Sequence, residues 1–228
     1  MAAVIEIQGG KLECGICRWH VFHLLNIAGT IDYRCANGNS IFRSLGLDLP
    51  IPTMRRRSVP VSHELLDVVD ENDNVIAVNT RGEIHARGLM HRAVHILLFN
   101  SKGELFLQKR SLAKDEQPGK WDSSAAGHVD SGEDYLDCAR REIGEELGIV
   151  VEQPLQELFR LAASMLTGNE HCVVYRYCFD GPLVLQTEEI DDGQWIDVMS
   201  MDQWVAEGES QLTEAVRLIW RRYRETSH

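Results

Sequence analysis

The chain has 228 residues, 44% hydrophobic and 25% charged, which suits one globular domain with an extension or at most two small domains. Its formal net charge of -12 argues against a nucleic acid polymer as partner, because affinity for a phosphate backbone comes from lysine and arginine. No apolar run is long enough to span a membrane, and Met1 to Gly10 lacks the basic start of a secretory leader. We therefore expect a cytoplasmic protein.

Residues 1–60 are interpreted as an N-terminal extension of uncertain structure, because glycines and prolines interrupt this segment repeatedly. Four residues in it could be offered as zinc ligands: Cys14, Cys17, His20 and His23. Zinc modules usually leave roughly a dozen residues or more between two ligand pairs, and this spacing does not. We favour a loosely packed or disordered extension, followed by one domain at 61–228.

A regular pattern of hydrophobic residues begins after residue 60 and predicts a series of strands. These are Leu65 to Val69, Val75 to Asn79, His91 to Asn100, Glu104 to Arg110, Leu155 to Ala163, His171 to Phe179 and Trp195 to Asp197. A short segment, Ser123 to Gly127, leads into the first of the helices described next. Two principal helices are expected, one before Gly148 and an amphipathic one over Gln211 to Arg224. Strands outnumber helices, which predicts an α/β fold with a mixed sheet packed between helices.

The stretch from Gly127 to Ile149 carries its own helix signals. Ser131, with Asp134 three residues later, resembles a capping box and predicts the start of a helix. Gly148 predicts its end, because a glycine after the last turn adopts the left-handed conformation without strain. Four apolar residues at helical spacing should face inward: Leu136, Ala139, Ile143 and Leu147.

Three acids of this helix are predicted to share one face. Residues three and four positions apart lie together on a helix, so Glu142, Glu145 and Glu146 should project side by side. Unpaired carboxylates in such a group repel each other, and a hard divalent cation with oxygen ligands removes the repulsion. We therefore expect Mg2+, or Mn2+ in its place, and find no motif for an organic cofactor.

The same stretch resembles the Nudix box, Gly-x5-Glu-x7-Arg-Glu-U-x-Glu-Glu-x-Gly-U with U aliphatic. Its nine specified positions are matched at Gly127, Glu133, Arg141, Glu142, Ile143, Glu145, Glu146, Gly148 and Ile149. The resemblance implies an α/β/α sandwich with a mixed sheet, in which the box forms a loop, a helix and a loop. It also implies a pyrophosphohydrolase, which hydrolyses the diphosphate linkage of a nucleoside diphosphate linked to a further group or of a related small phosphorylated compound.

The resemblance assigns roles within the box. The metal ligands it implies are Gly127, through its backbone carbonyl, and Glu142, Glu145 and Glu146. Glu133 and Arg141 are expected to form an internal ion pair that braces the loop against the helix, and Gly148 is structural.

We expect catalysis to involve Glu142, Glu145 and Glu189, with the base being either Glu142 or an acid of a later loop. Glu189 lies where many family members place such an acid. Glu188 is the near alternative, and a plain surface role for Glu189 suits the sequence equally well.

Residues outside the box narrow the resemblance to a branch that contains isopentenyl-diphosphate isomerases and YfcD-like hydrolases. They are His91-Arg92-Ala93, Gln108-Lys109-Arg110-Ser111, Lys114, Pro118 to Asp122 and Gly127-His128. The isomerase requires a cysteine two residues before its histidine, and Ala126 stands there before His128. An alanine has no proton to move, so we disfavour isomerisation. A non-catalytic nucleotide-binding module is also disfavoured, since binding alone would not require the full acid set.

Basic and histidine side chains near the box leave several interpretations open. Lys109 and Arg110 end a predicted strand and could bind substrate phosphate, although Arg110 would equally suit a pair with an acid. His91 and His128 align with metal-binding positions of the isomerase branch, and His85 lies six residues before His91. We interpret these histidines as hydrogen-bonded structural groups. The partner we expect is a small phosphorylated substrate, and the oligomeric state is open, a homodimer included.

Overall fold

The computed structural model describes residues 64–114, 116–207 and 210–226 in full. Of the first 63 residues it describes only the backbone of five strands. The chain divides into two compact units, Met1–Arg56 and Arg57–His228. The boundary that we place between residues 60 and 61 stays a prediction.

The first unit contains two small antiparallel sheets. β1 (Ile5–Gln8) pairs with β2 (Lys11–Cys14). The second sheet consists of β3 (His23–Ile27), β4 (Thr30–Arg34) and β5 (Ser40–Leu45), in that order.

The zinc hypothesis concerns residues whose side chains lie outside the described part of the chain. Cys17 and His20 are not described, and Cys14 and His23 are described only as strand backbone. The hypothesis is neither supported nor opposed by the fold.

The second unit is built on a mixed sheet, as predicted, and this sheet has seven strands. Its strands are β8 (His91–Phe99), β9 (Leu105–Arg110), β10 (Trp121–Asp122), β11 (Ala125–His128), β12 (Gln156–Leu161), β13 (Glu170–Cys178) and β14 (Ile190–Ile196). The main path runs β10-β9-β8-β13-β12, while β11 also pairs with β8 and β14 with β9. β8 and β13 are parallel, and the other pairs are antiparallel.

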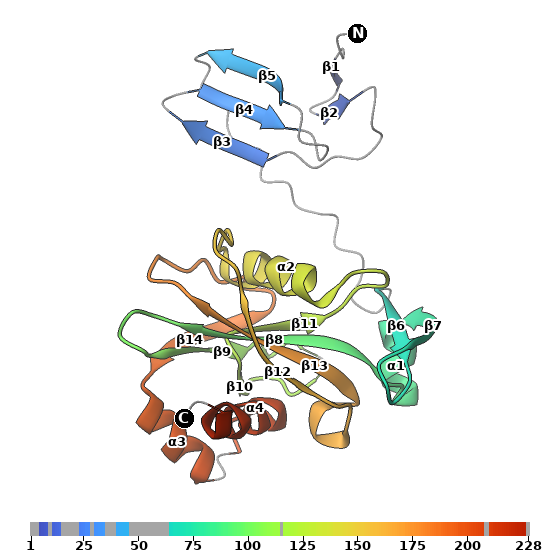
Figure 1. The fold of residues 1–228 in the computed structure, drawn as a ribbon, viewed down its shortest axis with the longest axis vertical. Coiled ribbons are helices and arrows are strands. Elements are labelled where there is room, and N and C mark those ends of the chain that lie inside the picture. The colour runs from blue at the N-terminus through green and yellow to red at the C-terminus, as the bar shows by residue number, and fades with distance from the viewer. Residues whose placement is uncertain are drawn as a thin grey trace. The chain divides into compact units, whose positions relative to one another are not determined.

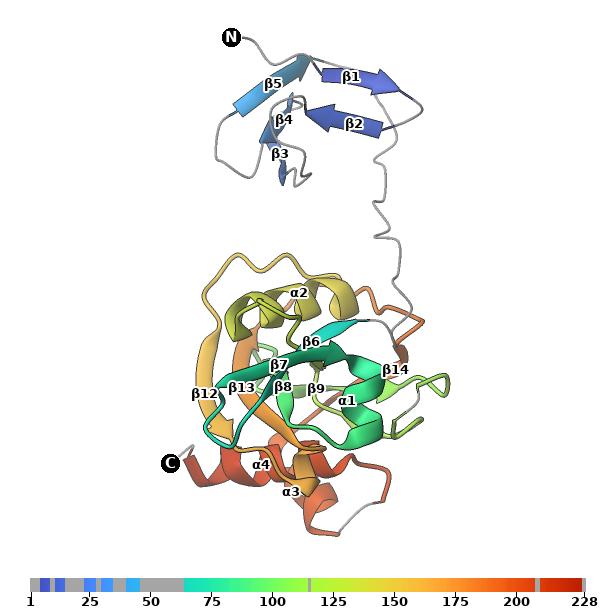
Figure 2. The ribbon, with the colours of Figure 1, turned by 90° about the vertical axis from the view of Figure 1, so that its right-hand side faces the viewer.

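Helices cover both faces of this sheet, which confirms the α/β/α sandwich (Figure 1). α2 (Tyr135–Leu147) lies on one face, and α3 (Val198–Ala206) and α4 (Glu214–Thr226) lie on the other (Figure 2). β8 supplies both cores, because successive side chains of a strand point to opposite faces. Ile96 and Leu98 pack in the cluster of α2, whereas Leu97 and Phe99 pack in the cluster of α4.

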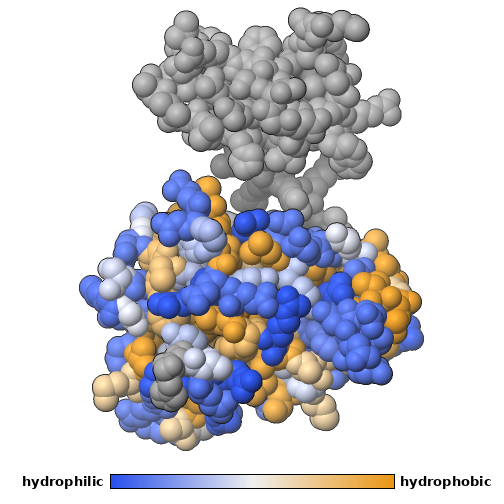
Figure 3. Space-filling model, in the orientation of Figure 1, coloured by the Kyte–Doolittle hydropathy of each residue, from blue (hydrophilic) through white to orange (hydrophobic). Residues whose placement is uncertain are grey.

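A hairpin and a short helix lie at one end of the sheet. The hairpin pairs β6 (Leu65–Val69) with β7 (Val75–Thr80), and α1 (Arg81–Arg87) follows it directly. A 3-10 turn, η2 (Met165–Thr167), precedes β13. The hairpin exposes large hydrophobic side chains, among them Ile76, and Figure 3 shows hydrophobic groups on this side of the domain.

Two helices were not predicted from the sequence. The described residues contain four helices rather than two, because α1 and α3 are too short for a clear helical period. α1 buries only Arg81 and Ile84, and α3 buries only Met201 and Val205. The last strand also begins earlier than predicted, at Ile190, since the segment before Trp195 pairs with β9.

The start of α2 is three residues later than the sequence indicated. Asp134, not Ser131, caps the helix and accepts a hydrogen bond from the Asp137 backbone N–H at 2.8 Å. The Ser131 hydroxyl instead donates to Asp67 Oδ1 at 2.7 Å, a partner on β6 that the local pattern could not reveal. The predicted end is confirmed: Gly148 is left-handed, at φ +68°, and its N–H bonds back to the helix.

Replacing Gly148 by alanine should destabilise the domain by about 2 kcal/mol, since a left-handed alanine costs about 1 to 2 kcal/mol. A Cβ there would also lie 2.8 Å from Val184 Cβ. Thermal unfolding checks this against Gly103→Ala, where φ is +78° and no heavy atom lies within 4 Å of the new Cβ. Equal losses of stability in the two variants would show that the contact with Val184 is immaterial.

Candidate functional site

Arg141 joins the box loop to the box helix. Its guanidinium donates to both carboxylate oxygens of Glu133, at 3.0 and 2.9 Å, in the bidentate geometry that makes such pairs strong. It also donates to the His128 carbonyl at 3.0 Å, to Glu142 Oε1 at 2.5 Å and to Glu145 Oε2 at 3.2 Å. The guanidinium group of Arg141 therefore holds the loop and contacts two of the box acids.

Glu142 is buried against Gly127. The glutamate is 8% exposed, and a Cβ added to Gly127 would lie 2.0 Å from its Oε1 atom. The lack of a side chain at Gly127 thus makes room for the carboxylate. This is a different use of the glycine from the backbone ligand that the resemblance implies, although the two are compatible.

Glu146 is held from two strands, whereas Glu145 faces solvent. Glu146 is 5% exposed, and its Oε2 atom accepts hydrogen bonds from Gln108 Nε2 at 3.0 Å and from the Ala126 backbone N–H at 3.1 Å. The side chain of Glu145 is 44% exposed. The three acids therefore offer two buried carboxylates and one exposed carboxylate that pairs with Arg141.

The electrostatics of the two buried acids suit a divalent cation. Burial raises the pKa of Glu142 well above its usual range, and the charge of nearby Glu146 raises it further. Burial raises the pKa of Glu146 to about 7, against the opposing effect of its hydrogen bonds. Two buried carboxylates that lie close together repel each other when both are ionised. A hard cation that binds oxygen ligands stabilises the ionised pair. Glu142, Glu145 and Glu146 would hold it.

This burial predicts a pH-dependent stability for the metal-free protein. Because the folded-state pKa of Glu146 is raised, its favourable contribution is complete below the unfolded value of 4.5 and is lost as pH rises through about 7. In EDTA, Glu146→Gln should match wild-type stability near pH 5 and exceed it at pH 8, by up to about 3 kcal/mol. Thermal unfolding of both proteins at the two pH values measures this. A difference that does not change with pH would contradict it.

The candidate base Glu189 lies beside the end of the box helix. The segment before it is bound to α2, since the Val184 and Gln186 N–H groups donate to the carbonyls of Leu147 and Glu146. The carboxylate of Glu189 is partly buried and pairs with Lys114. Glu188, the alternative, is exposed. Glu189 is thus more buried than Glu188, and its role as the base stays a prediction.

The two proposed phosphate ligands differ in their surroundings. Lys109 Nζ lies over the ring of Trp121, 5.9 Å from its centre. Arg110 donates to the Glu116 carbonyl at 3.1 and 3.2 Å and lies 3.4 Å from Asp122 Oδ2. Arg110 therefore has the acidic partner that the sequence left open, and it also holds the loop that carries Lys114. Phosphate binding by either residue stays a prediction.

Three histidines that the sequence interpretation treated separately lie together. The rings of His85, His91 and His128 have centroid separations of 4.9 to 5.1 Å, and each offers a ligating nitrogen within 4.8 Å of the others. They come from α1, β8 and β11. Glu170 on β13 adds a carboxylate, whose Oε1 lies 3.1 Å from His128 Nε2 and 3.6 Å from His91 Nε2.

The hydrogen bonds of this cluster leave nitrogen lone pairs inside it. His85 Nδ1 contacts Glu116 Oε1 at 2.5 Å, and His91 Nδ1 contacts the Leu89 carbonyl at 3.0 Å. Both acceptors require the proton on Nδ1, so the Nε2 atoms are unprotonated in the neutral rings. Both Nε2 atoms are buried without a hydrogen-bond partner among the described residues. Burial also lowers the pKa of His128, which favours the neutral form that binds metals. The donor set fits a transition metal or zinc.

Sequence reasoning missed several residues of this region. Gln108 belongs to a stretch that carries the resemblance but was given no role, and Glu116 belongs to no motif. Glu170 lies 79 positions from His91 in the chain. The parallel register of β13 with β8 pairs Glu170 with His91. In the sequence, His91 lies at the start of a predicted strand and Glu116 lies in a loop. These positions alone do not predict that the two side chains lie close to His85.

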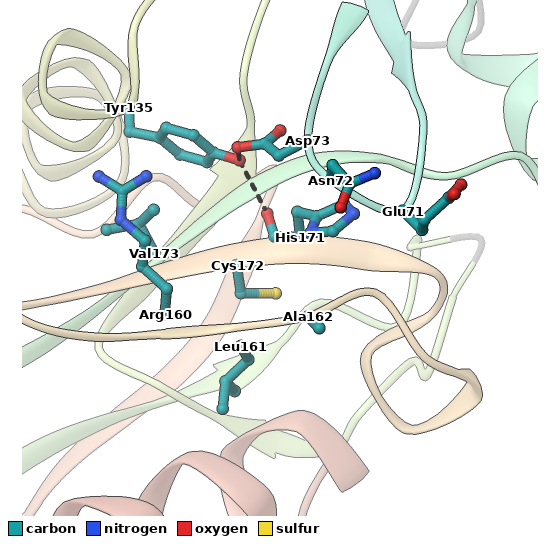
Figure 4. Close-up of a pocket in the computed structure, with 10 residues that line it drawn as sticks. All are labelled: Glu71, Asn72, Asp73, Tyr135, Arg160, Leu161, Ala162, His171, Cys172 and Val173. Carbon is teal, nitrogen blue, oxygen red and sulfur yellow. Dashed lines mark hydrogen bonds between the residues drawn. The ribbon is translucent and has the colours of Figure 1, made fainter.

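A separate pocket lies beside the start of the box helix (Figure 4). Tyr135 donates to Asp73 Oδ2 at 2.9 Å, and the guanidinium groups of Arg92 and Arg160 lie 5.6 and 5.4 Å from the centre of its ring. Arg92 also pairs with Asp73 at 2.6 Å. These contacts fasten the turn of the β6–β7 hairpin to α2. The lining residues do not include the box glutamates.

Comparison with known proteins identifies the family. The family model described as the NUDIX domain matches residues 89–216, which is more than half of the chain. The chain belongs to the Nudix family. The match spans the box and all seven strands of the sheet.

Relatives of two kinds were expected from the sequence, and both are found. An uncharacterised Nudix hydrolase of Pseudomonas aeruginosa is 44% identical over 133 residues, covering 58% of this chain and 78% of that protein. An isopentenyl-diphosphate Delta-isomerase of Burkholderia multivorans is 35% identical over 153 residues, covering 66% of this chain and 87% of that protein. The crystal structure of DR0079 from Deinococcus radiodurans is similar with a TM-score of 0.63 and 28% identity, covering 72% of this chain and all of that one.

The helices of this Nudix domain offer no membrane span. None of the helices in the described residues is both long enough and apolar enough to cross a bilayer.

Proposed function

We propose that this protein hydrolyses a diphosphate linkage in a nucleoside diphosphate linked to a further group, or in a related small phosphorylated compound, with Mg2+ or Mn2+. The observation that carries the proposal is the complete acid set of the Nudix box in a geometry suited to a cation. Glu142 and Glu146 are buried, and Glu145 is exposed to solvent beside Arg141. Such a cation, when bound, would neutralise the substrate's charge and make its phosphorus more electrophilic.

The residues of the chain then orient the reactants and move one proton. Arg141 and Gly127 keep Glu142 at the loop mouth, and Glu146 is held by Gln108 and Ala126. The proton of the attacking water passes to a carboxylate in the transition state. Glu189 is our candidate for this base, with Glu142 as the alternative. Lys114 pairs with Glu189 and would be drawn toward the negative substrate, which would free the base.

Hydrolysis is favoured over isomerisation by one side chain. Carbon protonation in the isomerase requires a thiol at the position of Ala126, and alanine cannot donate or accept a proton. Two of the described cysteines lie beside the histidine cluster, and both are buried: Cys172 on β13, and Cys138, whose thiol donates to the His128 carbonyl at 3.3 Å. Burial raises the pKa of each thiol well above its usual value, so both remain protonated.

The histidine cluster adds a second metal to the proposal. His85, His91 and His128, with Glu170, would hold a zinc, manganese or similar ion. The Nε2 atoms of His85 and His91 have no hydrogen-bond partner among the described residues, whereas that of His128 contacts Glu170. Elemental analysis of the purified full chain should find about one such ion per protein, lost in His91→Gln. A metal content that is the same in that variant would refute the second site and leave the box proposal intact.

A panel of substrates tests the proposed reaction. The release of phosphate or nucleoside monophosphate is measured with Mg2+ and with Mn2+ for nucleoside triphosphates, sugar nucleotides, dinucleotide cofactors, thiamine diphosphate and isopentenyl diphosphate. Metal-dependent release from at least one member is expected. Isomerisation of isopentenyl diphosphate without hydrolysis of any member would overturn the proposal.

A further inference from the structure

Gln108 occupies a place in the sheet where a polar side chain is unusual. It lies on β9, where its partners in the sheet are Asp122 of β10 and Gly193 of β14, and it is 2% exposed. The three residues that precede it in the strand are all buried and apolar. Burying an amide is unfavourable unless its donors and acceptors are satisfied. Its Nε2 donor is directed at Glu146 Oε2, 3.0 Å away.

The hydrogen bond from Gln108 is one of two that Glu146 Oε2 accepts. The Ala126 backbone N–H on β11 donates to the same oxygen at 3.1 Å. Donors from two different strands therefore fix Oε2, and with it the plane of the carboxylate. Both described bonds go to Oε2, which leaves Oε1 for a cation.

We propose that Gln108 is a positioning residue that pre-orients Glu146 for metal binding in the Nudix box. The inference rests on the proposed function, because it assigns Gln108 a role toward the metal of that site. Partners of this kind hold a ligand in its binding orientation before the metal arrives, so less order has to be created on binding. Losing such a partner typically weakens metal binding by about 10- to 100-fold.

Manganese binding to the full-length protein tests this without any substrate. Titration of free Mn2+, followed by its electron paramagnetic resonance signal, gives the dissociation constant directly. Gln108→Met keeps the length of the side chain and removes the donor, so the dissociation constant should rise about 10-fold or more. Gln194→Met is the control, because Gln194 lies on the neighbouring strand β14 opposite Leu107. It should leave binding unchanged.

A double-mutant cycle separates an effect on metal binding in the Nudix box from an effect on the histidine cluster or on the stability of the fold. In a Glu146→Gln background, Gln108→Met should cause no further loss, since the two side chains act as one unit. Gln108→Asn serves if the methionine variant unfolds, because it retains the amide but is one methylene too short to reach Oε2. The inference is overturned if a folded Gln108 variant binds Mn2+ as tightly as the wild type, or if the losses from positions 108 and 146 add. A wild-type protein that binds no Mn2+ would overturn the proposed function, and this inference with it.

Discussion

Replacing Glu145 and Glu146 together by glutamine is expected to lower kcat about a thousandfold on any substrate that the wild type hydrolyses. The variant keeps the size of both side chains but loses two of the three box charges that would hold the cation. Stabilisation of transition-state charge by a metal is worth several kcal/mol, and a loss of about 4 kcal/mol corresponds to about a thousandfold. Steady-state kinetics at saturating metal measure the effect.

A charge-matched control separates a local effect from a global one. Glu214 and Glu225 are exposed acids of α4, on the face of the sheet opposite the box helix, and their double replacement by glutamine should leave kcat unchanged. Ligand binding distinguishes a hydrolase from a non-catalytic binding module. A non-catalytic nucleotide-binding module would bind its ligand equally well in the Glu145→Gln, Glu146→Gln variant without metal. Retained turnover in that variant would refute the mechanism.

Replacing Gly127 by alanine is expected to lower kcat by at least about a hundredfold while leaving the fold intact. The new Cβ would lie 2.0 Å from Glu142 Oε1 and 2.2 Å from its carboxyl carbon, so this carboxylate has to move. The colliding atoms belong to the end of a flexible side chain rather than to the backbone, so the change should disturb the site more than the core. A displacement of about 1 Å at a reacting group can cost about a hundredfold in rate.

Gly144→Ala is the matched control for this experiment. Gly144 lies in the box helix itself, and a Cβ there would have Ile149 O as its nearest neighbour at 3.7 Å, an ordinary contact. An alanine in a helix interior stabilises by about 0.5 to 1 kcal/mol over glycine, so this variant should unfold slightly later and retain its rate. Equal rates in Gly127→Ala and the wild type would show that Glu142 needs no fixed position.

The box could be predicted from the sequence because its information is local. Helical spacing places Glu142, Glu145 and Glu146 on one side, and Gly148 marks the end of α2 in the structure as in the sequence. Long apolar strands such as β8 were equally visible, since their residues alternate between two cores. The predicted start of α2 was wrong because the Ser131 hydroxyl does not cap the helix. It donates a hydrogen bond to Asp67, on a strand much earlier in the chain.

The rest of the site depends on contacts between distant segments, which sequence patterns do not specify. Glu170 meets His91 only through the register of two parallel strands, and no short turn fixes that register. Glu116 reaches His85 across 31 residues, and Gln108 reaches Glu146 across 38. Histidines considered one at a time were therefore interpreted as hydrogen-bonded structural groups, and their meeting in one cluster could not be predicted.

Hydrolysis in water labelled with oxygen-18 tests the central claim most directly. The full chain is incubated with Mg2+ and the diphosphate panel, and the products are analysed by mass spectrometry. The proposed reaction predicts one labelled oxygen on a phosphate or nucleoside monophosphate product for each bond broken, dependent on metal and abolished in the Glu145→Gln, Glu146→Gln variant. Conversion of isopentenyl diphosphate to its isomer, with no label in any phosphate product, would contradict it.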